Sequence, residues 1–274
     1  MGKKINYEKR KEWFQSGIEN GIIHIKCTGW SSFQSFMNEY IRDARDYIWR
    51  GQSRDDWVLI PSLDRKLNEL NLLHDKEIRS KILKRFKFAM RGRGERSHSL
   101  LRFENNLWAL GRHHGLLTPL LDWTSSPYIA TYFAFEKKIK FPTDCRVIYG
   151  LSVKLVHQKS KSLTEKKNIK FISPLVDDIP RLIPQRGLFT RAPNGVDIES
   201  WVKNNISNKE KRWVLIKILI PNKSREMFLK SLDRMAISQL ELFPDISGAC
   251  QYCNLGLEIK DYCQRLTDSD IFTR

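Results

Sequence analysis

The chain has 274 residues, 41% of them hydrophobic, and it includes eight tryptophans. This composition excludes a disordered chain and supplies enough apolar surface for a substantial core. The sequence has no run of eighteen apolar residues and no apolar signal core in its first residues, MGKKINYEKRKEW, so we expect a cytoplasmic protein with no membrane partner. Five cysteines without the spacing of a disulfide framework agree with reduced thiols.

The net charge of +17 is the strongest global signal in the sequence. It comes from 48 basic and 31 acidic residues, and the basic excess is concentrated in residues 79–96, 137–170 and 203–217. Such a field favours a nucleic acid, another anionic macromolecule or an anionic small molecule as the partner. A lysine-rich, solvated surface without a ligand is the alternative, and composition does not separate the two.

The spacing of apolar residues predicts the elements of the first half of the chain. After a polar N-terminal tail we expect strands over 24–27 and 47–51, an extended segment over 57–63, and helices from Ser31 or Ser32, over 64–90 and over 99–112. A buried helix should begin near Pro127, because a hydroxyl of Ser125 or Ser126 can accept bonds from its first amides. The hydroxyls would then lie at a strand-to-helix corner.

The second half of the chain is predicted to be richer in strands. We expect strands over 146–153, 183–190 and 213–220, a mobile polar loop over 157–170, a short helix through Leu232 and a last helix over 246–264. The run over 213–220 is β-branched and nearly continuous, which is typical of a central strand. These patterns predict a single α+β domain, with a mixed, mostly antiparallel β core and helices grouped around it.

The sequence predicts no metal site. Cys250 and Cys253 have a zinc-like spacing but lack a partner pair, and they share a helical pattern with Cys263, so we interpret them as buried core thiols. The carboxylates show no cluster with the spacing of a divalent metal site. A metal-dependent nuclease is therefore the weakest of the functions considered.

Residues 113–136 hold the largest group of chemically reactive side chains. Two histidines, the carboxylate of Asp122 and three consecutive hydroxyls precede the pattern of the buried helix. Polar groups held against a core element are typical of a functional site. A simpler interpretation stays open, in which the histidines end one helix, where an imidazolium meets the helix dipole, and the hydroxyls cap the next.

Six separated motifs extend this pattern along the chain. They are Trp49-Arg50-Gly51-Gln52, His113-His114-Gly115-Leu116, Leu120-Leu121-Asp122-Trp123-Thr124, Ala130 with Tyr132-Phe133-Ala134, Gln185 with Gly187-Leu188-Phe189, and Gln239-Leu240-Glu241-Leu242-Phe243-Pro244-Asp245. In this order they resemble the FRG domain, with tryptophan replacing the phenylalanine of that family's Phe-Arg-Gly motif. The resemblance implies an N-terminal extension over 1–29 and an FRG-like domain over 30–274. The family is often linked to toxins and antiphage defence, so a role as such an effector is expected.

A second resemblance concerns chemistry. Mono-ADP-ribosyltransferases of the arginine-serine-glutamate type carry an Arg-Gly strand end, a hydroxyl triplet before a helix, and a Gln-x-Glu or Glu-x-Glu pair. This chain offers Arg50-Gly51, Thr124-Ser125-Ser126 and Gln239-Leu240-Glu241 in the same order. It departs from the pattern in the order of the three hydroxyls, in the proline directly after them, and in Pro244, which would stop the strand expected to carry the glutamate.

This resemblance implies an ADP-ribosyltransferase-like fold and an NAD-dependent transfer of ADP-ribose to a macromolecule or nucleotide. The residues that would bind NAD, the substrate, are Arg50, Gly51, His113, His114, Asp122, Thr124, Ser125 and Ser126, and those that would be catalytic are Gln239 and Glu241. The physical chemistry is coherent, since an arginine fork suits a diphosphate and a carboxylate stabilises the ribosyl cation formed when nicotinamide leaves.

Two alternatives remain open. In the first, Arg50 pairs with Asp122 or Glu241 and only ties the sheet together. In the second, the same site binds a nucleotide or a nucleic-acid end without performing chemistry. The transferase hypothesis requires that Arg50, the three hydroxyls and Glu241 meet around one cleft.

Overall fold

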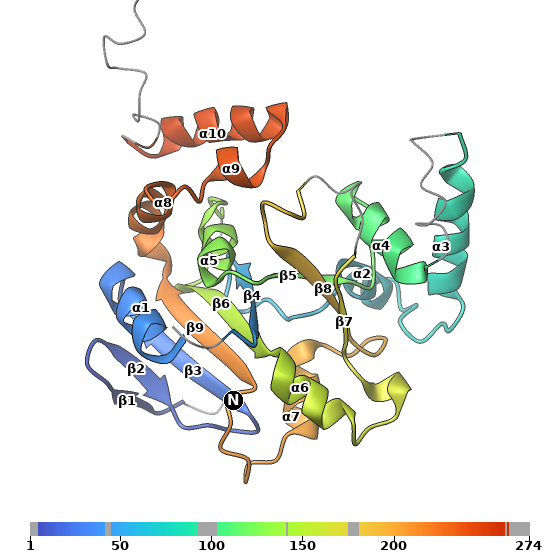
Figure 1. Cartoon of the computed structure of the whole chain (residues 1–274), viewed down its shortest axis with the longest axis horizontal. Coiled ribbons are helices and arrows are strands. Elements are labelled where there is room, and N and C mark those ends of the chain that lie inside the picture. Colours follow the sequence, from blue (N-terminus) through green and yellow to red (C-terminus); the bar gives the residue numbers. More distant parts are fainter. Residues whose placement is uncertain are drawn as a thin grey trace, which may run out of the picture.

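A computed structural model describes residues 5–41, 45–92, 103–140, 142–174, 181–260 and 262 (Figure 1). The fold is α+β, as the sequence predicts, and the nine strands within these residues form one sheet in the order β1-β2-β3-β9-β6-β4-β5-β8-β7. The strands are β1 (Tyr7–Lys9), β2 (Trp13–Ser16), β3 (Ile22–Cys27), β4 (Tyr47–Gln52), β5 (Leu121–Thr124), β6 (Cys145–Ser152), β7 (Lys170–Ile172), β8 (Gly187–Arg191) and β9 (Leu215–Pro221). β3 and β9 run parallel, and the other neighbouring strands in these residues are antiparallel.

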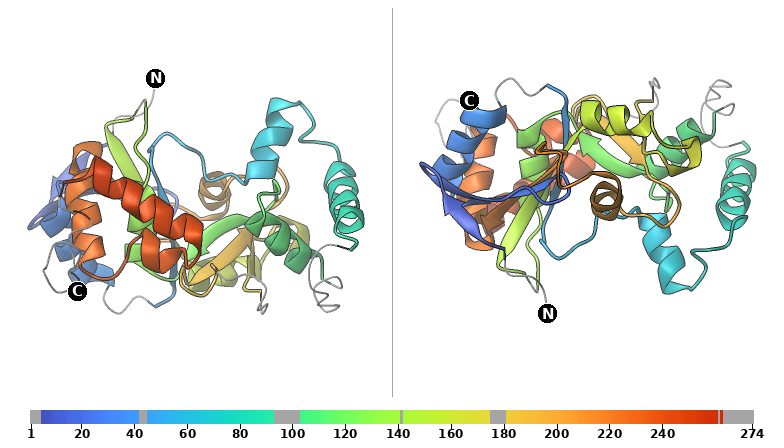
Figure 2. Two further views of the ribbon diagram at one scale, coloured as in Figure 1. Left: turned by 90° about the horizontal axis from the view of Figure 1, so that it is seen from above. Right: turned by 90° about the horizontal axis from the view of Figure 1, so that it is seen from below.

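Helices surround this sheet (Figures 1 and 2). They are α1 (Trp30–Phe36), continued by a π-helical turn (Met37–Ile41), α2 (Ser62–Glu69), α3 (Ile78–Ala89), α4 (Glu104–His113), α5 (Pro127–Phe135), α6 (Val153–Ser160), α7 (Ile198–Asn205), α8 (Arg225–Asp233), α9 (Gln239–Leu242) and α10 (Ile246–Glu258). Both figures show α3 and α4 at one end of the molecule and α8 to α10 at the opposite end.

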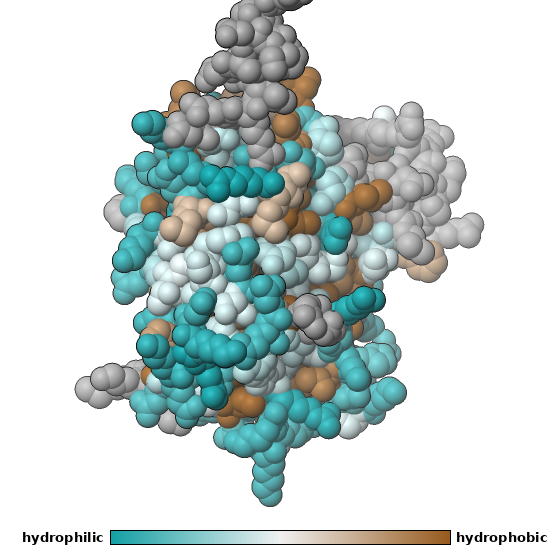
Figure 3. Space-filling model, turned by 60° about the vertical axis from the view of Figure 1, so that its left-hand side comes forward, coloured by the Kyte–Doolittle hydropathy of each residue, from teal (hydrophilic) through white to brown (hydrophobic). Residues whose placement is uncertain are grey.

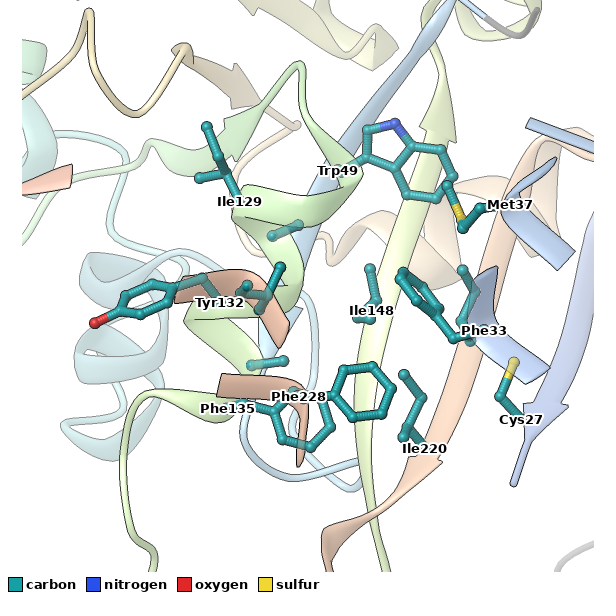
Figure 4. Close-up of a cluster of buried hydrophobic side chains, with 14 of the residues drawn as sticks. Cys27, Phe33, Met37, Trp49, Ile129, Tyr132, Phe135, Ile148, Ile220 and Phe228 are labelled. Atoms are coloured by element: carbon teal, nitrogen blue, oxygen red, sulfur yellow. The ribbon is translucent and has the colours of Figure 1, made fainter. Parts of the chain in front are cut away.

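Alternation along the strands sends side chains into two different cores. In β9, Ile216, Ile218 and Ile220 pack with α1, α5 and α8, whereas Leu215 packs with α6 and α7. Figure 4 shows part of the first core, where the rings of Phe135 and Phe228 stack with centroids 4.5 Å apart. The centre of the sheet is therefore buried on both faces, which explains the almost unbroken apolar sequence of β9.

The sheet is nearly divided between β4 and β5. These strands share one residue pair, Trp49 with Thr124, whereas β4 pairs with β6 along its full length and β5 pairs with β8 along its full length. The strands do not pair beyond this point, so they leave a gap between residues 50–52 on one side and 121–123 on the other. This gap is where the candidate site lies.

The corner between β5 and α5 forms as the sequence predicts. Pro127 is the first residue of α5, and the Ser126 hydroxyl accepts a hydrogen bond from the Ile129 amide at 3.3 Å. The Thr124 hydroxyl accepts one from the Ser126 amide at 3.1 Å. These bonds satisfy amides that the start of a helix leaves without partners, so they fix where α5 begins next to the gap.

Some predicted boundaries are wrong. The pattern over 64–90 forms two helices, α2 and α3, and α2 begins inside the segment predicted to be extended. The predicted loop over 157–170 includes the end of α6, and the predicted strand over 183–190 starts only at Gly187. The start of the helix predicted over 99–112 lies outside the described residues, and α4 is described from Glu104. The ends of these helices and strands are set by caps and by strand partners from distant segments. The local periodicity of the sequence does not reveal such partners.

The N-terminal residues also belong to the sheet. β1, β2 and β3 extend it beyond β9, with Trp13 fully buried, so residues 7–27 are not a plain polar tail. The predicted division between an extension over 1–29 and a domain over 30–274 stays a prediction. None of the helices in the described residues is long and apolar enough to span a bilayer. On the face drawn in Figure 3, hydrophilic side chains predominate in the lower half.

Two cysteines differ from the prediction. Cys250 and Cys253 lie on α10 and are exposed, not buried. The residues through which α10 is buried are Gly248 and Leu255, so its packing face is narrow and excludes both thiols. Cys263 lies outside the described residues.

Candidate functional site

A cavity of about 560 Å³ opens where β4 and β5 separate. Its wall includes β4 and the residues after it, β5, parts of α4 and α5, β8 and the segment leading into it, and Phe243 after α9. The polar side chains in the wall include Arg50, Gln52, Arg112, His113, Asp122, Thr124, Glu136, Lys137, Arg181 and Gln185. This volume lies within the usual range of small-molecule sites, about 300–1,000 Å³.

Gly51 sets the distance between β4 and α5 in this wall. A Cβ atom at position 51 would lie 1.9 Å from the Ala130 carbonyl oxygen and 2.6 Å from the Ala134 amide nitrogen. Only glycine allows the strand to approach the helix backbone this closely. Gly51 thus allows the backbone of α5 to pack directly against β4, next to Arg50.

Arg50 reaches across the gap from β4 to β5. Its Nη1 donates a hydrogen bond to the Asp122 carbonyl oxygen at 2.8 Å and lies 3.6 Å from the Asp122 carboxylate. Its Nε is buried and has no hydrogen-bond partner in the described part of the chain. Burial lowers the pKa of the Arg50 guanidinium, and the Asp122 charge opposes this effect. An arginine nevertheless stays charged at neutral pH, so the wall holds a partly buried cation with a buried, unused donor.

Arg112, from the last turn of α4, holds the Asp122 carboxylate in a bidentate ion pair. Its Nη2 and Nε donate to the two carboxylate oxygens at 2.6 and 3.2 Å, and its Nη1 donates to the Ser62 hydroxyl at 2.9 Å. Burial alone would raise the pKa of Asp122, but Arg112 and Arg50 outweigh it and hold that pKa below its ordinary value. Asp122 is therefore an anion between two cations, and it orients both.

Gln52 lies two residues after Arg50 on β4, so both side chains leave the same face of the strand. The side chain is buried, with 6% of the residue exposed, and its Oε1 has no partner among the described residues. The cavity wall thus contains an unpaired donor on Arg50 and an unpaired acceptor on Gln52. Buried polar atoms are nearly always hydrogen-bonded, so this pair indicates a place where a ligand or water supplies the partners.

The opposite part of the wall combines a cation with aromatic rings. Arg181 donates two bonds to one Asp245 carboxylate oxygen, at 2.6 and 2.9 Å, and its guanidinium lies 5.0 Å from the centre of the Phe243 ring. That ring packs edge-on against Phe133 of α5, with centroids 6.2 Å apart. Gln185 donates to the Leu242 carbonyl at 3.1 Å, which holds the Phe243 segment in place. This part of the wall can hold a flat apolar group beside a cation.

The predicted hydroxyls serve the helix start. Thr124 lines the cavity, but its Oγ1 accepts the Ser126 amide bond. Ser126 caps α5, and Ser125 is exposed, and neither is part of the cavity wall. The structure thus agrees with the simpler interpretation of these residues as a cap.

The two histidines are separated by the helix end. His113 is the last residue of α4 and lines the cavity, whereas His114 caps the helix and lies outside the wall. Their rings meet edge to face, with centroids 4.9 Å apart. Burial, together with the charges of His114 and Arg181, lowers the pKa of His113. His113 is therefore a neutral side chain of the wall near neutral pH.

The structure does not bring the predicted catalytic pair to the cavity. Glu241 is exposed, and its carboxylate accepts hydrogen bonds from the Ser238 hydroxyl and, at 3.1 Å, from the Ser238 amide, which forms a capping box at the start of α9. Gln239 is buried, where it accepts from the Tyr132 hydroxyl at 2.7 Å and donates to Gln251 at 2.6 Å. The segment is a helix because Ser238 caps it, so it cannot present both side chains from a strand edge as the resemblance implied.

Local sequence patterns do not predict that Arg112, Glu136 and Arg181 line the cavity. Arg112 directly precedes the reactive stretch over 113–136 and Glu136 is its last residue, yet no local pattern shows that they face the gap. Arg181 lies in a segment without periodicity. Gln52 had a usable signal, since a strand that directs Arg50 into a site also directs the residue two positions later.

The match to a known family model covers much of this cavity wall. No curated protein and no solved structure matches the chain. Residues 45–142 match the family model of the FRG domain, and they include β4, α4, β5 and α5, which form most of the cavity wall. The FRG resemblance is thus confirmed for residues 45–142.

Proposed function

We propose that the cavity binds a nucleotide through its phosphate groups, with NAD as the expected ligand. The observation that carries the proposal is the buried Arg50 Nε, which has no hydrogen-bond partner among the described residues. Leaving such a donor unpaired costs about 1–3 kcal/mol. A phosphate oxygen supplies the missing acceptor, and guanidinium forks form strong, charge-assisted bonds with phosphates.

The charges of the wall favour an anion. Arg50, Arg112, Lys137 and Arg181 contribute four cations, while Asp122 and Glu136 contribute two carboxyl groups. The excess of positive charge sits in a partly enclosed space, where electrostatic attraction is less screened than in open water. Phe133 and Phe243 add an apolar surface that suits a nucleobase or a nicotinamide ring.

The resemblance to mono-ADP-ribosyltransferases extends the proposal to an NAD-dependent transfer of ADP-ribose. Such a reaction needs a carboxylate that stabilises the ribosyl cation. Since Glu241 belongs to a helix cap, this role would fall to Asp122, the carboxylate in the wall that Arg112 and Arg50 hold ionised. Consumption of NAD or modification of a target would also account for a role as a toxin or antiphage defence effector.

Titration calorimetry with ADP-ribose, NAD and adenosine tests the binding proposal. We expect the two phosphate-containing ligands to bind and adenosine, which lacks phosphate, to bind at least about tenfold more weakly. Arg50→Ala should weaken ADP-ribose binding by about 1.5–3 kcal/mol, whereas Arg234→Ala, on the exposed end of α8, should have no effect. Equal affinity for adenosine and ADP-ribose, or no binding of either, would contradict the proposal.

Incubation with labelled NAD separates the transferase from a module that only binds. Release of nicotinamide, with the label transferred to protein or nucleic acid, is the result expected of a transferase. Binding of NAD without its consumption is the result expected of the alternative, a nucleotide-binding module. The two functions share the cavity, so the calorimetry above applies to both.

A further inference from the structure

Glu136 occupies an unusual position in the cavity wall. It follows the last residue of α5, and its side chain is 17% exposed. The cation recorded beside its carboxylate is the Lys137 ammonium at 3.9 Å, a distance too long for a hydrogen bond, and Lys137 itself is 73% exposed. The carboxyl group is therefore largely buried, and no described residue supplies a close counter-ion.

The guanidinium groups that face this end of α5 hold backbone carbonyls. Arg146 of β6 donates from Nη1 to the Ala134 carbonyl at 2.6 Å. Arg225 of α8 donates from Nε to the Phe135 carbonyl at 2.9 Å and from Nη2 to the Glu136 carbonyl at 2.7 Å, and it also pairs with Glu258. These bonds satisfy carbonyls at the helix end and fix the position of Glu136, but they leave its carboxylate without a guanidinium partner.

The charged groups on the cavity side are also engaged. Arg50 of β4 is bonded to Asp122 of β5, and Arg112 holds the Asp122 carboxylate. The negative end of the α5 dipole further disfavours an anion at position 136. Burial accordingly raises the pKa of Glu136 to about 7, with Lys137 acting in the opposite direction. Near neutral pH, much of Glu136 is thus a neutral acid in a cavity whose other side chains favour an anion.

We infer that Glu136 binds the phosphate-bearing ligand as a neutral carboxylic acid and donates a hydrogen bond to one of its oxygens. This inference rests on the proposed nucleotide binding. An ionised Glu136 would repel the phosphates, whereas the neutral form adds a donor to those of Arg50. When the ligand binds above neutral pH, a proton from solvent therefore moves onto a Glu136 carboxylate oxygen, and no other bond changes.

ADP-ribose is the suitable probe, because each of its phosphates lacks a group that titrates between about pH 6 and pH 9. We would titrate it into the whole protein at several pH values, in buffers of different ionisation enthalpy, and obtain both affinity and proton uptake. For the wild-type protein, the Kd should rise by up to about tenfold per pH unit above pH 7, and uptake should approach about one proton per ligand. In Glu136→Gln, which keeps the shape and cannot ionise, the Kd should be nearly constant and proton uptake should disappear.

His113 is the matched control, since it also lines the cavity and can ionise, although its lowered pKa keeps it neutral near neutral pH. His113→Gln should retain the proton uptake and the pH dependence of the wild-type protein. Binding of ADP-ribose without pH dependence, or a pH dependence removed by His113→Gln and kept by Glu136→Gln, would overturn the role of Glu136 alone. Absence of ADP-ribose binding at every pH would instead overturn the proposed function on which the inference rests.

Discussion

Arg50 and Asp122 connect β4 and β5 beyond the point where these strands stop pairing, through a 2.8 Å hydrogen bond from Arg50 Nη1 to the Asp122 carbonyl. The bond goes to the backbone, so it does not depend on the Asp122 carboxylate, which Arg112 holds. Two arginines from different elements thus converge on one aspartate. The pairing of Arg50 with Asp122 expected from the sequence is present, and it leaves the Arg50 Nε unused.

Asp122→Asn should lower stability without disconnecting the strands. The substitution removes the bidentate ion pair with Arg112 but keeps the carbonyl that accepts from Arg50. Because both side chains of the ion pair are partly exposed, the free energy of unfolding should fall by only about 1–2 kcal/mol in urea denaturation. Arg112→Gln should cost a similar amount, and the double variant should cost much less than the sum. Additive losses would mean that the two side chains do not act as a pair.

Gly51→Ala should be strongly destabilising. The new methyl group would overlap the backbone of α5 at Ala130, which cannot move aside without shifting the whole helix. We expect a loss of about 3 kcal/mol or more in the free energy of unfolding, together with loss of ADP-ribose binding. Gly17→Ala is the control, since nothing lies within 4 Å of its added Cβ, and it should change stability by less than about 0.5 kcal/mol. Equal thermal melting of the two variants would contradict the close packing of β4 on α5.

Glu241 should behave as a helix cap. Glutamine can fill the same place in a capping box, so Glu241→Gln should leave stability and ADP-ribose binding nearly unchanged. Glu241→Ala should lower the free energy of unfolding by about 0.5–1 kcal/mol, the usual cost of losing a cap. Melting curves and calorimetry on both variants check this. A selective loss of NAD turnover in Glu241→Gln, at wild-type stability, would show instead that this carboxylate is catalytic.

The sequence predicted the parts of the site that depend on local signals. The strand over 47–51 and the cap before Pro127 follow from periodicity and capping chemistry, which act within a few residues. The order of the family motifs further indicated that Arg50 and Asp122 belong to one region, and they are in contact. The first two predictions succeeded because they depend on residues within one short stretch, whereas the contact of Arg50 with Asp122, 72 residues apart, was indicated only by the family motifs.

Long-range packing decides the parts that the sequence did not predict. Gln239-Leu240-Glu241 fits the Gln-x-Glu pattern of the transferases. The spacing Ser238-x-x-Glu241 is also that of a capping box, and the hydrogen bonds of this box determine where the Glu241 carboxylate lies. At Glu136 the deciding contacts come from residues distant in the sequence. Nothing near Glu136 in the sequence shows that Arg146 and Arg225 bind backbone carbonyls at the end of α5 instead of the Glu136 carboxylate. Directions of side chains across a gap in a sheet depend on such distant partners.

The cations on and just after helix α3 give a prediction for the nucleic-acid partner expected from the net charge of +17. Lys84, Arg85, Lys87 and Arg91 are exposed, and the Arg91 guanidinium lies 4.8 Å from the centre of the exposed Phe88 ring. Binding to single- or double-stranded nucleic acid should weaken steeply with salt, since phosphate contacts release counter-ions. A double change of Lys84 and Arg85 to glutamine should reduce the slope of log K against log salt by about 1–2. The same double change at Lys9 and Lys11, which lie outside the three basic segments, should leave this slope unchanged. If the wild-type protein does not bind nucleic acid at low salt, the positive charge reflects amino-acid composition and not a nucleic-acid partner.

Glu136 should also make stability depend on pH, independently of any ligand. Its folded-state pKa of about 7 lies above the ordinary value of 4.5, so its contribution to stability is fully present below about pH 4.5 and is lost as the pH rises through about 7. Glutamine avoids this loss because it cannot ionise. Glu136→Gln should therefore match the wild-type protein at about pH 4 or below and exceed its stability above pH 7, by at most about 3 kcal/mol. Glu12→Gln, at an exposed loop position, is the control and should follow the wild-type curve throughout. Urea denaturation from about pH 4 to pH 9 measures the difference, and parallel curves for Glu136→Gln and the wild-type protein would show that the Glu136 carboxyl is not held in its neutral form.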